Sequence, residues 1–595
     1  MANYLAVVRH ESLVAEGDLL RRVLGGVSEE TTVIPLTGGW ELTWVAQRAS
    51  QDLLPDQGIF SGFAIDDADS RIIFGARGLA AVSRQSLESD LPGCYVHVHW
   101  AEEHLELTAD LYRSLSVSVT SVPGLSLISD SPYVLMQLRR TLGLPVTVDD
   151  VVASSLLWRN SMSGQLLGSR TLAREISYVP VGGRIRLDLA SERAVASRSG
   201  HLVPELFAPA THDYALELRR AAHRIASLVH TIAASGPEHA RLALSGGKDS
   251  RILLAAALLS PQARATARFS CTNTAEQHRR DFEVVSDLSR EFGFPLGPRR
   301  PDDDRTAELR RVANPLALWF SDSAMTYFPV KLQAYSLLDK GPFAIAGFGS
   351  ELYKGNYGLR PVGAIRVNIA KNQPGPAASF REITEGALRD SGIDPQHPLG
   401  AEWHYLLLRN ALHGGRFTPV TKLGLRPLQQ RSLVGLSKLP EEARGAMWST
   451  PRQIPDDLLA LLSPSLAARP FDRPSKDRTA DEVIERLRQL GGPLSSSEVV
   501  DYRISGAPSD VHDGPVRTLL ELVDQSRIAG RLSRENIAPY VDEAAETVTT
   551  AGISAEWAEL AREQQSAIRD RSIPVGHTHG MPGRLLALAE VIRTV

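Results

Sequence analysis

The stretch from Leu242 to Leu259, LALSGGKDSRILLAAALL, constrains the fold more than any other part of the chain. It begins with an apolar run typical of a buried strand, turns through Ser245–Ser250, and continues into a Leu- and Ala-rich run that predicts a helix. Gly246 and Gly247 have no Cβ, so the backbone can turn sharply there and approach a bound group closely. The stretch therefore predicts a strand, a glycine turn and a helix in that order.

Such a unit is suited to binding phosphate, because a helix N-terminus offers unpaired N–H groups and the positive end of its dipole. Ser245 and Ser250 can add hydroxyl donors, and Lys248 can add charge. Asp249 is unexpected beside a phosphate unless a cation lies between them, so we expect it to bind magnesium. A Gly-Gly turn before a helix is common in α/β proteins, but the full S-G-G-x-D-S pattern in this context is much rarer.

The pattern resembles the pyrophosphate loop of the ATP pyrophosphatase superfamily, whose members cleave ATP to AMP and pyrophosphate while adenylating a substrate. It is not a Walker A loop, because no G-x-x-x-x-G-K-[ST] surrounds it. The resemblance implies ATP and Mg²⁺ as cofactors, with Ser245, Gly246, Gly247, Asp249 and Ser250 around the nucleotide.

Length and composition narrow the class of protein. At 595 residues the chain is too long for one core, so two or three domains are expected. The net charge of −4 and the lack of a long basic run argue against nucleic acid as a main partner. Cys94 and Cys271 are too few for a disulfide framework and suit a reducing cytoplasm. The sequence shows no signal peptide and no apolar run long enough for a membrane span.

The fold class expected is α/β and multidomain. Short, partly alternating runs predict a β-rich region over residues 1 to about 190, followed by a linker at residues 191–211. His97 and His99 share one face of a predicted strand there. A metal pair is possible in principle, but a solvated strand face is the simpler interpretation, and the same holds for His577 and His579.

Strands alternate with helices after residue 201, which predicts a parallel sheet with its ligand at the C-terminal strand ends. The expected elements are a helix at Tyr214–Ala234, a strand at Ala263–Thr272 that includes Ser270, helices at Asp281–Phe292 and Ser323–Leu338, and a strand at Pro342–Ala346. Residues 481–595 have the pattern of amphipathic helices.

A second glycine-rich stretch, Gly347–Tyr357, follows that last strand. Its glycines can bring backbone close to a ligand, and Glu351 supplies a second carboxylate, which could share a magnesium ion with Asp249. Taken alone, the stretch is equally compatible with an ordinary surface turn.

With both loops considered, the chain resembles the asparagine synthetase superfamily over residues 1 to about 480. Gly347, Gly349, Ser350, Gly355 and Tyr357 match the family's G-E-G-S-D-E-L-F-G-G-Y, and Glu351 stands where the family has its metal-binding Asp. The resemblance implies a glutaminase-like (Ntn-type) domain at 1–200, an ATP-pyrophosphatase domain at 201–480 and a helical extension at 481–595. It also implies that Gly347, Gly349, Ser350 and Ser270 contact the nucleotide and that Lys476 steadies the leaving pyrophosphate.

Departures from the family pattern suggest the reaction. Glutamine-dependent members need Cys directly after Met1, and this chain has Ala2, so ammonia is not expected to be the nucleophile. Phe348 stands where β-lactam synthetases use a Tyr in proton abstraction and where asparagine synthetases have Glu; Phe can do neither.

The branch of the superfamily most similar to this chain is that of the lasso peptide cyclases. It implies a linear core peptide as substrate, whose Asp or Glu side chain is adenylated and then joined to the N-terminal amine. A leader peptidase and a leader-recognition protein would be partners. Alternatives are a β-lactam-type or other amide-forming enzyme acting on a small amino acid, and a non-catalytic scaffold.

Overall fold

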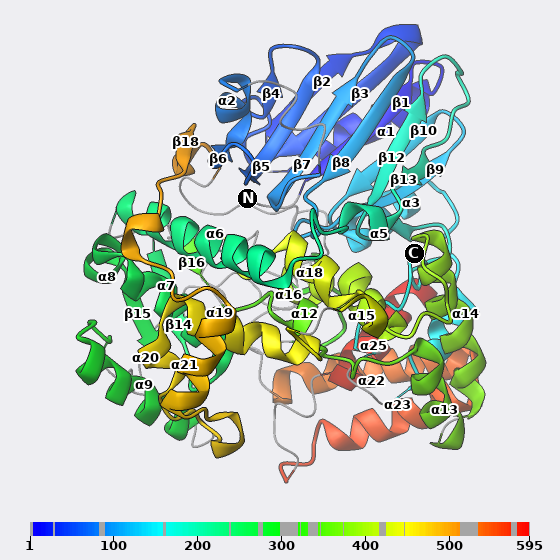
Figure 1. The fold of residues 1–595 in the computed structure, drawn as a ribbon. Coiled ribbons are helices and arrows are strands. Elements are labelled where there is room, and N and C mark those ends of the chain that lie inside the picture. The colour runs from blue at the N-terminus through cyan, green and yellow to red at the C-terminus, as the bar shows by residue number, and fades with distance from the viewer. Residues whose placement is uncertain are drawn as a thin grey trace.

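The computed structural model describes the chain except for residues 1–3, 28–29, 83–89, 159–161, 163, 237–239, 272–277, 298–318, 322, 331–342, 346, 373, 416–423, 445–446, 512–533, 573–579 and 594–595. The described part is an α/β protein with a β-rich N-terminal region, a parallel sheet flanked by helices, and a helical C-terminal region (Figure 1). No helix in this part of the chain has the length and apolar character needed to cross a membrane.

Two sheets, whose strand pairs are antiparallel apart from β6·β18, make up the N-terminal region (Figure 1). One has the strand order β11 (Ser177–Tyr178), β9 (Ser118–Val122), β10 (Leu125–Ser129), β1 (Leu5–His10), β3 (Trp40–Ala46), β2 (Glu30–Pro35). The other has the order β13 (Ser197–Gly200), β12 (Gly183–Asp188), β8 (His104–Ala109), β7 (Gly93–Trp100), β5 (Gly58–Asp66), β6 (Arg71–Phe74), β18 (Arg503–Ser505), with β4 (Leu53–Leu54) paired to β5.

The period of two along β7 explains how the second sheet is buried on both faces. Cys94, Val96 and Val98 belong to the main core. Tyr95, on the opposite face, packs with Phe60 in a smaller core that includes side chains of α2 (Gly75–Ala80). The other helices of this region are α1 (Val14–Leu24), α3 (Pro132–Thr141), α4 (Asp150–Ser155) and α5 (Val203–Leu206).

The N-terminal sheet includes two strands that the sequence did not predict. β13 lies in the predicted linker and pairs with β12. β18 lies in the predicted helical tail and pairs in parallel with β6, with Ile504 opposite Ile72. Both are too short for their alternation to be distinguished from a loop.

The predicted parallel sheet is confirmed. Its order is β15 (Arg268–Cys271), β14 (Ala240–Leu244), β16 (Phe343–Ile345), β17 (Gly424–Leu425), and all three pairings are parallel. α7 (Lys248–Leu259) packs against both α6 (Tyr214–Ala234) and α19 (Ile454–Leu462) on one side of this sheet (Figure 1). Nearby helices are α8 (Pro261–Thr266), α9 (Arg279–Phe292), α12 (Glu351–Lys354), α18 (Arg431–Ser437), α20 (Pro464–Ala467) and α21 (Ala480–Gln489).

Two predicted elements in this region are wrong in part. The stretch Ala263–Thr272, expected as one strand, starts inside α8, because Ser260 caps that helix and Pro261 occupies its first position. The described part of the expected helix Ser323–Leu338 is a turn followed by extended backbone. Its backbone instead bonds to another segment, with Leu166 N–H donating to Thr326 O at 2.9 Å.

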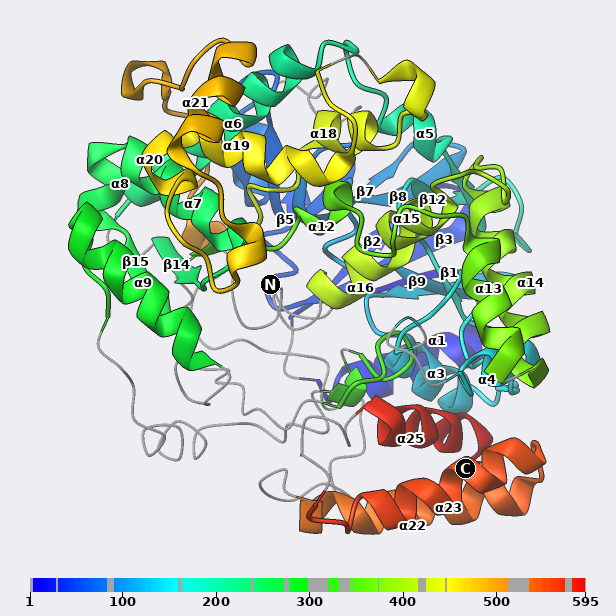
Figure 2. The same cartoon turned by 60° about the horizontal axis from the view of Figure 1, so that its bottom comes forward.

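The C-terminal helices are α22 (Arg534–Ala551), α23 (Ala555–Ala567) and α25 (Gly580–Ile592), and they lie together at one side of the molecule (Figure 2). α25 is tied to the N-terminal region: Tyr133 donates to Glu590 at 3.1 Å, and the buried Arg584 donates to the carbonyls of Leu156 and Trp158 at 2.7 Å. Along the chain, β16 and β17 of the parallel sheet are separated by α12 and by α13 (Val362–Asn372), α14 (Pro374–Asp390), α15 (Gly400–His404), a π-helical turn (Tyr405–Arg409) and α16 (Asn410–Gly415).

Candidate functional site

The first loop, Ser245–Ser250, connects the C-terminal end of β14 to the start of α7, as predicted. Its two serines fix its shape: Ser250 Oγ accepts from Ser245 N–H at 3.0 Å, and Ser245 Oγ accepts from Gly247 N–H at 3.3 Å. Gly247 is the N-cap of α7 and supplies no side-chain cap. The first N–H groups of α7 therefore depend on other groups for their hydrogen bonds.

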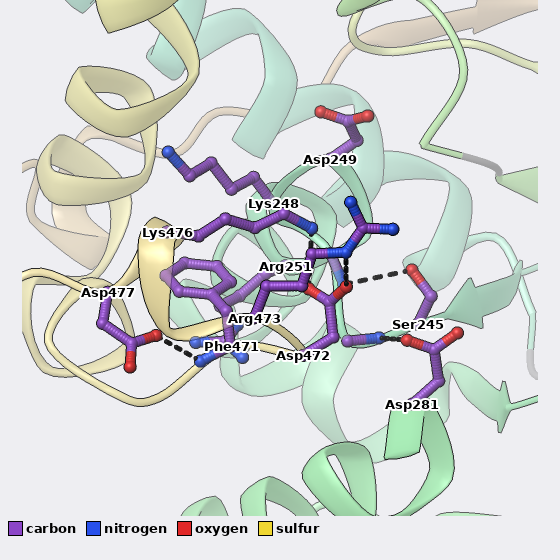
Figure 3. A network of polar contacts seen from close by, with 12 residues as sticks. Ser245, Lys248, Asp249, Arg251, Asp281, Phe471, Asp472, Arg473, Lys476 and Asp477 are labelled. Atoms are coloured by element: carbon purple, nitrogen blue, oxygen red, sulfur yellow. Dashed lines mark hydrogen bonds and ion pairs between the residues drawn. The ribbon is translucent and has the colours of Figure 1, made fainter. Parts of the chain in front are cut away.

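A carboxylate already lies on this loop. Gly246 N–H donates to Asp281 Oδ1 at 2.8 Å, and Asp281 comes from the first turn of α9. Figure 3 shows Asp281 and Asp249 on opposite sides of the group of labelled side chains. The loop thus binds an anionic oxygen through its backbone, which fits the chemistry of a phosphate site.

Arg251, in the first turn of α7, holds a second segment against the loop. The residue is 1% exposed, and its guanidinium donates to the carbonyls of Arg469 and Pro470 at 2.8 Å each. It also lies 3.8 Å from the ring centroid of Phe471 (Figure 3). Burial lowers the pKa of Arg251 to about 10. Asp472 N–H then donates to Gly246 O at 3.2 Å, so this segment contacts the first loop directly.

Lys476 lies on this segment, close to the first loop. Its ammonium is 2.7 Å from Oδ1 of Asp472, the residue after Phe471 (Figure 3). Lys248 is directed elsewhere, to Asp456 at 2.5 Å. Of these two lysines, only Lys476 is paired with a residue that contacts the loop backbone.

The second loop, Gly347–Tyr357, packs against the first. A Cβ on Gly347 would lie 2.9 Å from Ser250 N and 3.0 Å from the carbonyl carbon of Asp249. Gly349 has φ +125°, a conformation that strongly favours glycine, and a Cβ there would meet Gln429 N at 2.9 Å. The structure therefore brings the two glycine-rich stretches into contact, although they are far apart in the sequence.

Ser350 and Glu351 occupy defined positions in the second loop. Glu351 Oε2 accepts from Gly349 N–H at 2.9 Å. Ser350 is fully buried, and within the described part of the chain its Oγ has no hydrogen-bond partner. A buried hydroxyl without a partner is costly and indicates a group that a ligand or water satisfies.

Asp249 and Glu351 converge on one cation, the ammonium of Lys354. Its Nζ is 2.5 Å from Asp249 Oδ2 and 3.7 Å from Glu351 Oε1. Mg²⁺ is commonly held by one or two carboxylates together with substrate phosphates, so this pair fits a magnesium ion shared with a nucleotide. In the described ranges, no group of three or more His, Cys, Asp or Glu side chains is arranged to hold a metal by itself.

An aromatic cluster flanks Phe348 of the second loop. Tyr327 and His413 share a hydrogen bond of 2.7 Å, and the His413 ring centroid lies 6.0 Å from that of Phe348. The guanidinium carbon of Arg426 lies 5.3 Å from the centroid of the Phe348 ring. The sequence did not point to this cluster, because its members come from distant segments with no shared motif.

Lys354 and Asp281 were also missed by the sequence analysis. The only sequence signal for Lys354 is its position three residues after Glu351 on a short helix, which places both on one face. Asp281 lies in the first turn of a predicted helix, where an acidic residue is commonly explained by the helix dipole.

Ser270 lies next to the strand that leads into the first loop. It is on β15, opposite Ala243 of β14, and its hydroxyl is 3.5 Å from Leu242 O. His97 and His99 line a pocket of about 470 Å³ on the outer face of the N-terminal sheet, together with Glu106 and Arg184. Cys94 is buried in the core, and burial raises the pKa of its thiol, so it is not placed as a nucleophile. Ala2, His577 and His579 lie outside the described residues.

Comparison with known proteins adds no relative. No protein-family model matches the chain. A search of the curated proteins found no match either. The fold and site therefore define only the broad class: an α/β protein whose parallel sheet presents, at its C-terminal edge, a backbone loop holding a carboxylate and a carboxylate pair holding a cation.

Proposed function

We propose that this protein is an ATP-dependent, AMP-forming ligase that closes a lasso peptide by forming an isopeptide bond. The observation that carries the proposal is the backbone contact between the two loops, with Gly347 against Asp249 and Ser250. This contact puts an anion-binding backbone and a carboxylate pair at one strand edge, the arrangement that adenylation by a magnesium nucleotide needs.

Each part of the site has a proposed role in binding the nucleotide. We expect the first loop to bind pyrophosphate through its backbone and the hydroxyls of Ser245 and Ser250, with a phosphate oxygen replacing Asp281 on the Gly246 N–H. Asp249 and Glu351 would hold Mg²⁺, which when bound would offset the negative charge of the phosphates. Lys476, which pairs with Asp472 at 2.7 Å beside the first loop, would balance the charge of the departing pyrophosphate.

The substrate carboxylate attacks the α-phosphorus of ATP, and pyrophosphate departs. The N-terminal amine of the peptide then attacks the acyl carbon and forms the C–N bond. The bond from that carbon to the oxygen bridging to phosphorus breaks, AMP leaves with this oxygen, and the amine loses a proton to solvent. The main contribution of the protein is to hold the folded peptide so that amine and acyl adenylate meet. Phe348 beside the site offers no proton acceptor, which favours an amine that forms an unstrained amide.

The test is nucleotide turnover with purified full-length protein, ATP and Mg²⁺, with AMP and ADP resolved. One reaction contains a pool of linear leaderless peptides and the other contains amino acids. AMP with peptides only, together with a peptide product lighter by one water, supports the macrocyclase. AMP with a small β-amino acid instead moves the function to the β-lactam-type alternative, and no turnover in either reaction contradicts the proposal.

A further inference from the structure

Lys354 is the cation that contacts both candidate metal ligands. Its ammonium is 2.5 Å from Asp249 on the first loop and 3.7 Å from Glu351 on the second, and its side chain is 31% exposed. Glu351 and Lys354 begin and end the single turn of α12, so both side chains project from one face. One ammonium therefore links carboxylates that come from two different loops.

The other lysines near the site are paired elsewhere. Lys248 is 2.5 Å from Asp456, and Lys476 is 2.7 Å from Asp472. Lys438 is buried and donates to the carbonyl of Leu352 at 2.6 Å. Among the described lysines around the two loops, Lys354 alone is placed to offset the charge of Asp249 and Glu351 together.

We infer that Lys354 competes with a divalent cation for Asp249 and Glu351, and that the arriving cation displaces its ammonium toward the bound phosphates. The competition is a property of the protein alone, while the second half of the inference rests on the proposed function. An ammonium and a Mg²⁺ ion on the same carboxylate oxygens weaken each other's binding, because like charges at this range repel strongly. The displaced ammonium stays tethered to α12, where it adds positive charge near the phosphates.

The experiment is Mn²⁺ binding to the full-length protein without nucleotide, measured from the electron paramagnetic resonance signal of free Mn²⁺. Lys354→Met keeps the length of the side chain and removes the charge, so Mn²⁺ should bind at least about threefold tighter than to the wild type. Lys354→Arg keeps the charge, and its guanidinium can donate hydrogen bonds to two carboxylate oxygens. Mn²⁺ should therefore bind no tighter than to the wild type. Unchanged or weaker binding by Lys354→Met would overturn the inference.

Matched variants show which site is being measured. Lys248→Met removes the same charge one residue from Asp249 but breaks a pair outside the site, so it should change Mn²⁺ affinity less than Lys354→Met does. Asp249→Asn should abolish the Mn²⁺ binding that Lys354→Met strengthens. Equal tightening by Lys248→Met, or full binding by Asp249→Asn, would contradict a specific competition at this carboxylate pair.

Turnover separates this inference from the proposed function. With a peptide that supports AMP release, Lys354→Met should need less Mg²⁺ for half-maximal rate yet have a lower kcat, whereas a purely structural lysine would make both worse. If the wild type forms no AMP, the proposed function fails, but the Mn²⁺ comparison still decides whether Lys354 competes for the metal.

Discussion

Gly347 and Ser250 are in backbone contact: a Cβ added to Gly347 would lie only 2.9 Å from Ser250 N. The same Cβ would be 3.0 Å from the carbonyl carbon of Asp249. Because the neighbouring atoms are backbone, no side-chain rearrangement can relieve this clash. The contact sets the distance between the two loops, and therefore between Asp249 and Glu351.

Gly347→Ala should therefore push the loops apart and lower kcat/KM for ATP by at least about a hundredfold, since small displacements of reacting groups are that costly. The measurement is AMP release at varied ATP. Gly386→Ala is the control, because a Cβ there would have no neighbouring atom within 4 Å. This substitution should leave the rate unchanged. Equal rates for Gly347→Ala and the wild type would show that the loop contact is not needed.

Asp249→Asn keeps the shape of the side chain but removes its charge, and with it one of the two carboxylates that face Lys354. We expect AMP formation to fall by at least about a hundredfold, as expected for loss of a metal ligand. Asp456→Asn, which affects the pair with Lys248 instead, should have a much smaller effect. Substantial AMP formation by Asp249→Asn would exclude it as a metal ligand.

The carboxylate of Asp281 accepts a hydrogen bond from Gly246 N–H, at the position where a phosphate oxygen would bind. Asp281→Asn can still accept that hydrogen bond but no longer repels phosphate. We expect the KM for ATP to fall about three- to tenfold, consistent with removal of one like charge near the site. Initial rates at varied ATP measure this. A higher KM would instead mean that the loop needs the charge of Asp281 to keep its shape.

Arg251→Met should loosen the segment that carries Lys476. The substitution leaves the carbonyls of Arg469 and Pro470 without their donor in a buried place, which should cost about 2–4 kcal/mol of unfolding free energy. Urea denaturation followed by fluorescence measures the loss. Arg290→Met, which breaks an exposed ion pair with Asp287, should cost less than about 1 kcal/mol. Similar losses for the two variants would contradict an anchoring role for Arg251.

Asp52 should make the stability of the protein depend on pH. Its carboxyl group is 6% exposed and accepts from Trp44 Nε1 at 3.1 Å, and burial raises its pKa to about 7. In the unfolded chain the pKa is about 3.9. Between about pH 4 and pH 7 the folded protein binds more protons than the unfolded one, so this group's stabilising contribution is lost as pH rises.

Asp52→Asn removes that titration while an amide oxygen can still accept the indole hydrogen bond. At pH 8 we expect the unfolding free energy to rise by about 1–4 kcal/mol relative to the wild type, with little difference at pH 4. Urea denaturation at both pH values measures it. A difference between variant and wild type that is the same at pH 4 and pH 8 would contradict the assigned pKa.

The sequence predicted correctly those elements whose signals lie within a few consecutive residues. The strand, turn and helix around Gly246 follow from an apolar run, two glycines and strong helix formers in order, and the structure has them at Ala240–Leu244 and Lys248–Leu259. The long helix Tyr214–Ala234 has the predicted bounds, because its apolar face repeats over many turns and Asp213 caps its start.

Short elements were less predictable. The strand Arg503–Ser505 exists because β6 offers a free edge for it, and three residues carry no period of their own. Over its described part, residues 323–330, the expected helix after Ser323 is replaced by a turn whose backbone bonds to residues 164–166. Both outcomes depend on partners that lie far away in the sequence.

The first loop and the alternation of strands and helices in the parallel sheet therefore follow from local sequence. The charge pairs at the site depend on packing: Lys354 faces Asp249 and Glu351, Asp281 accepts from Gly246 N–H, and Arg251 anchors the segment of Lys476. The physical reason is the sequence separation over which each kind of interaction acts. Propensities and turns act over a few residues, whereas ion pairs and buried hydrogen bonds form between whichever groups the packing of the core brings within about 3 Å.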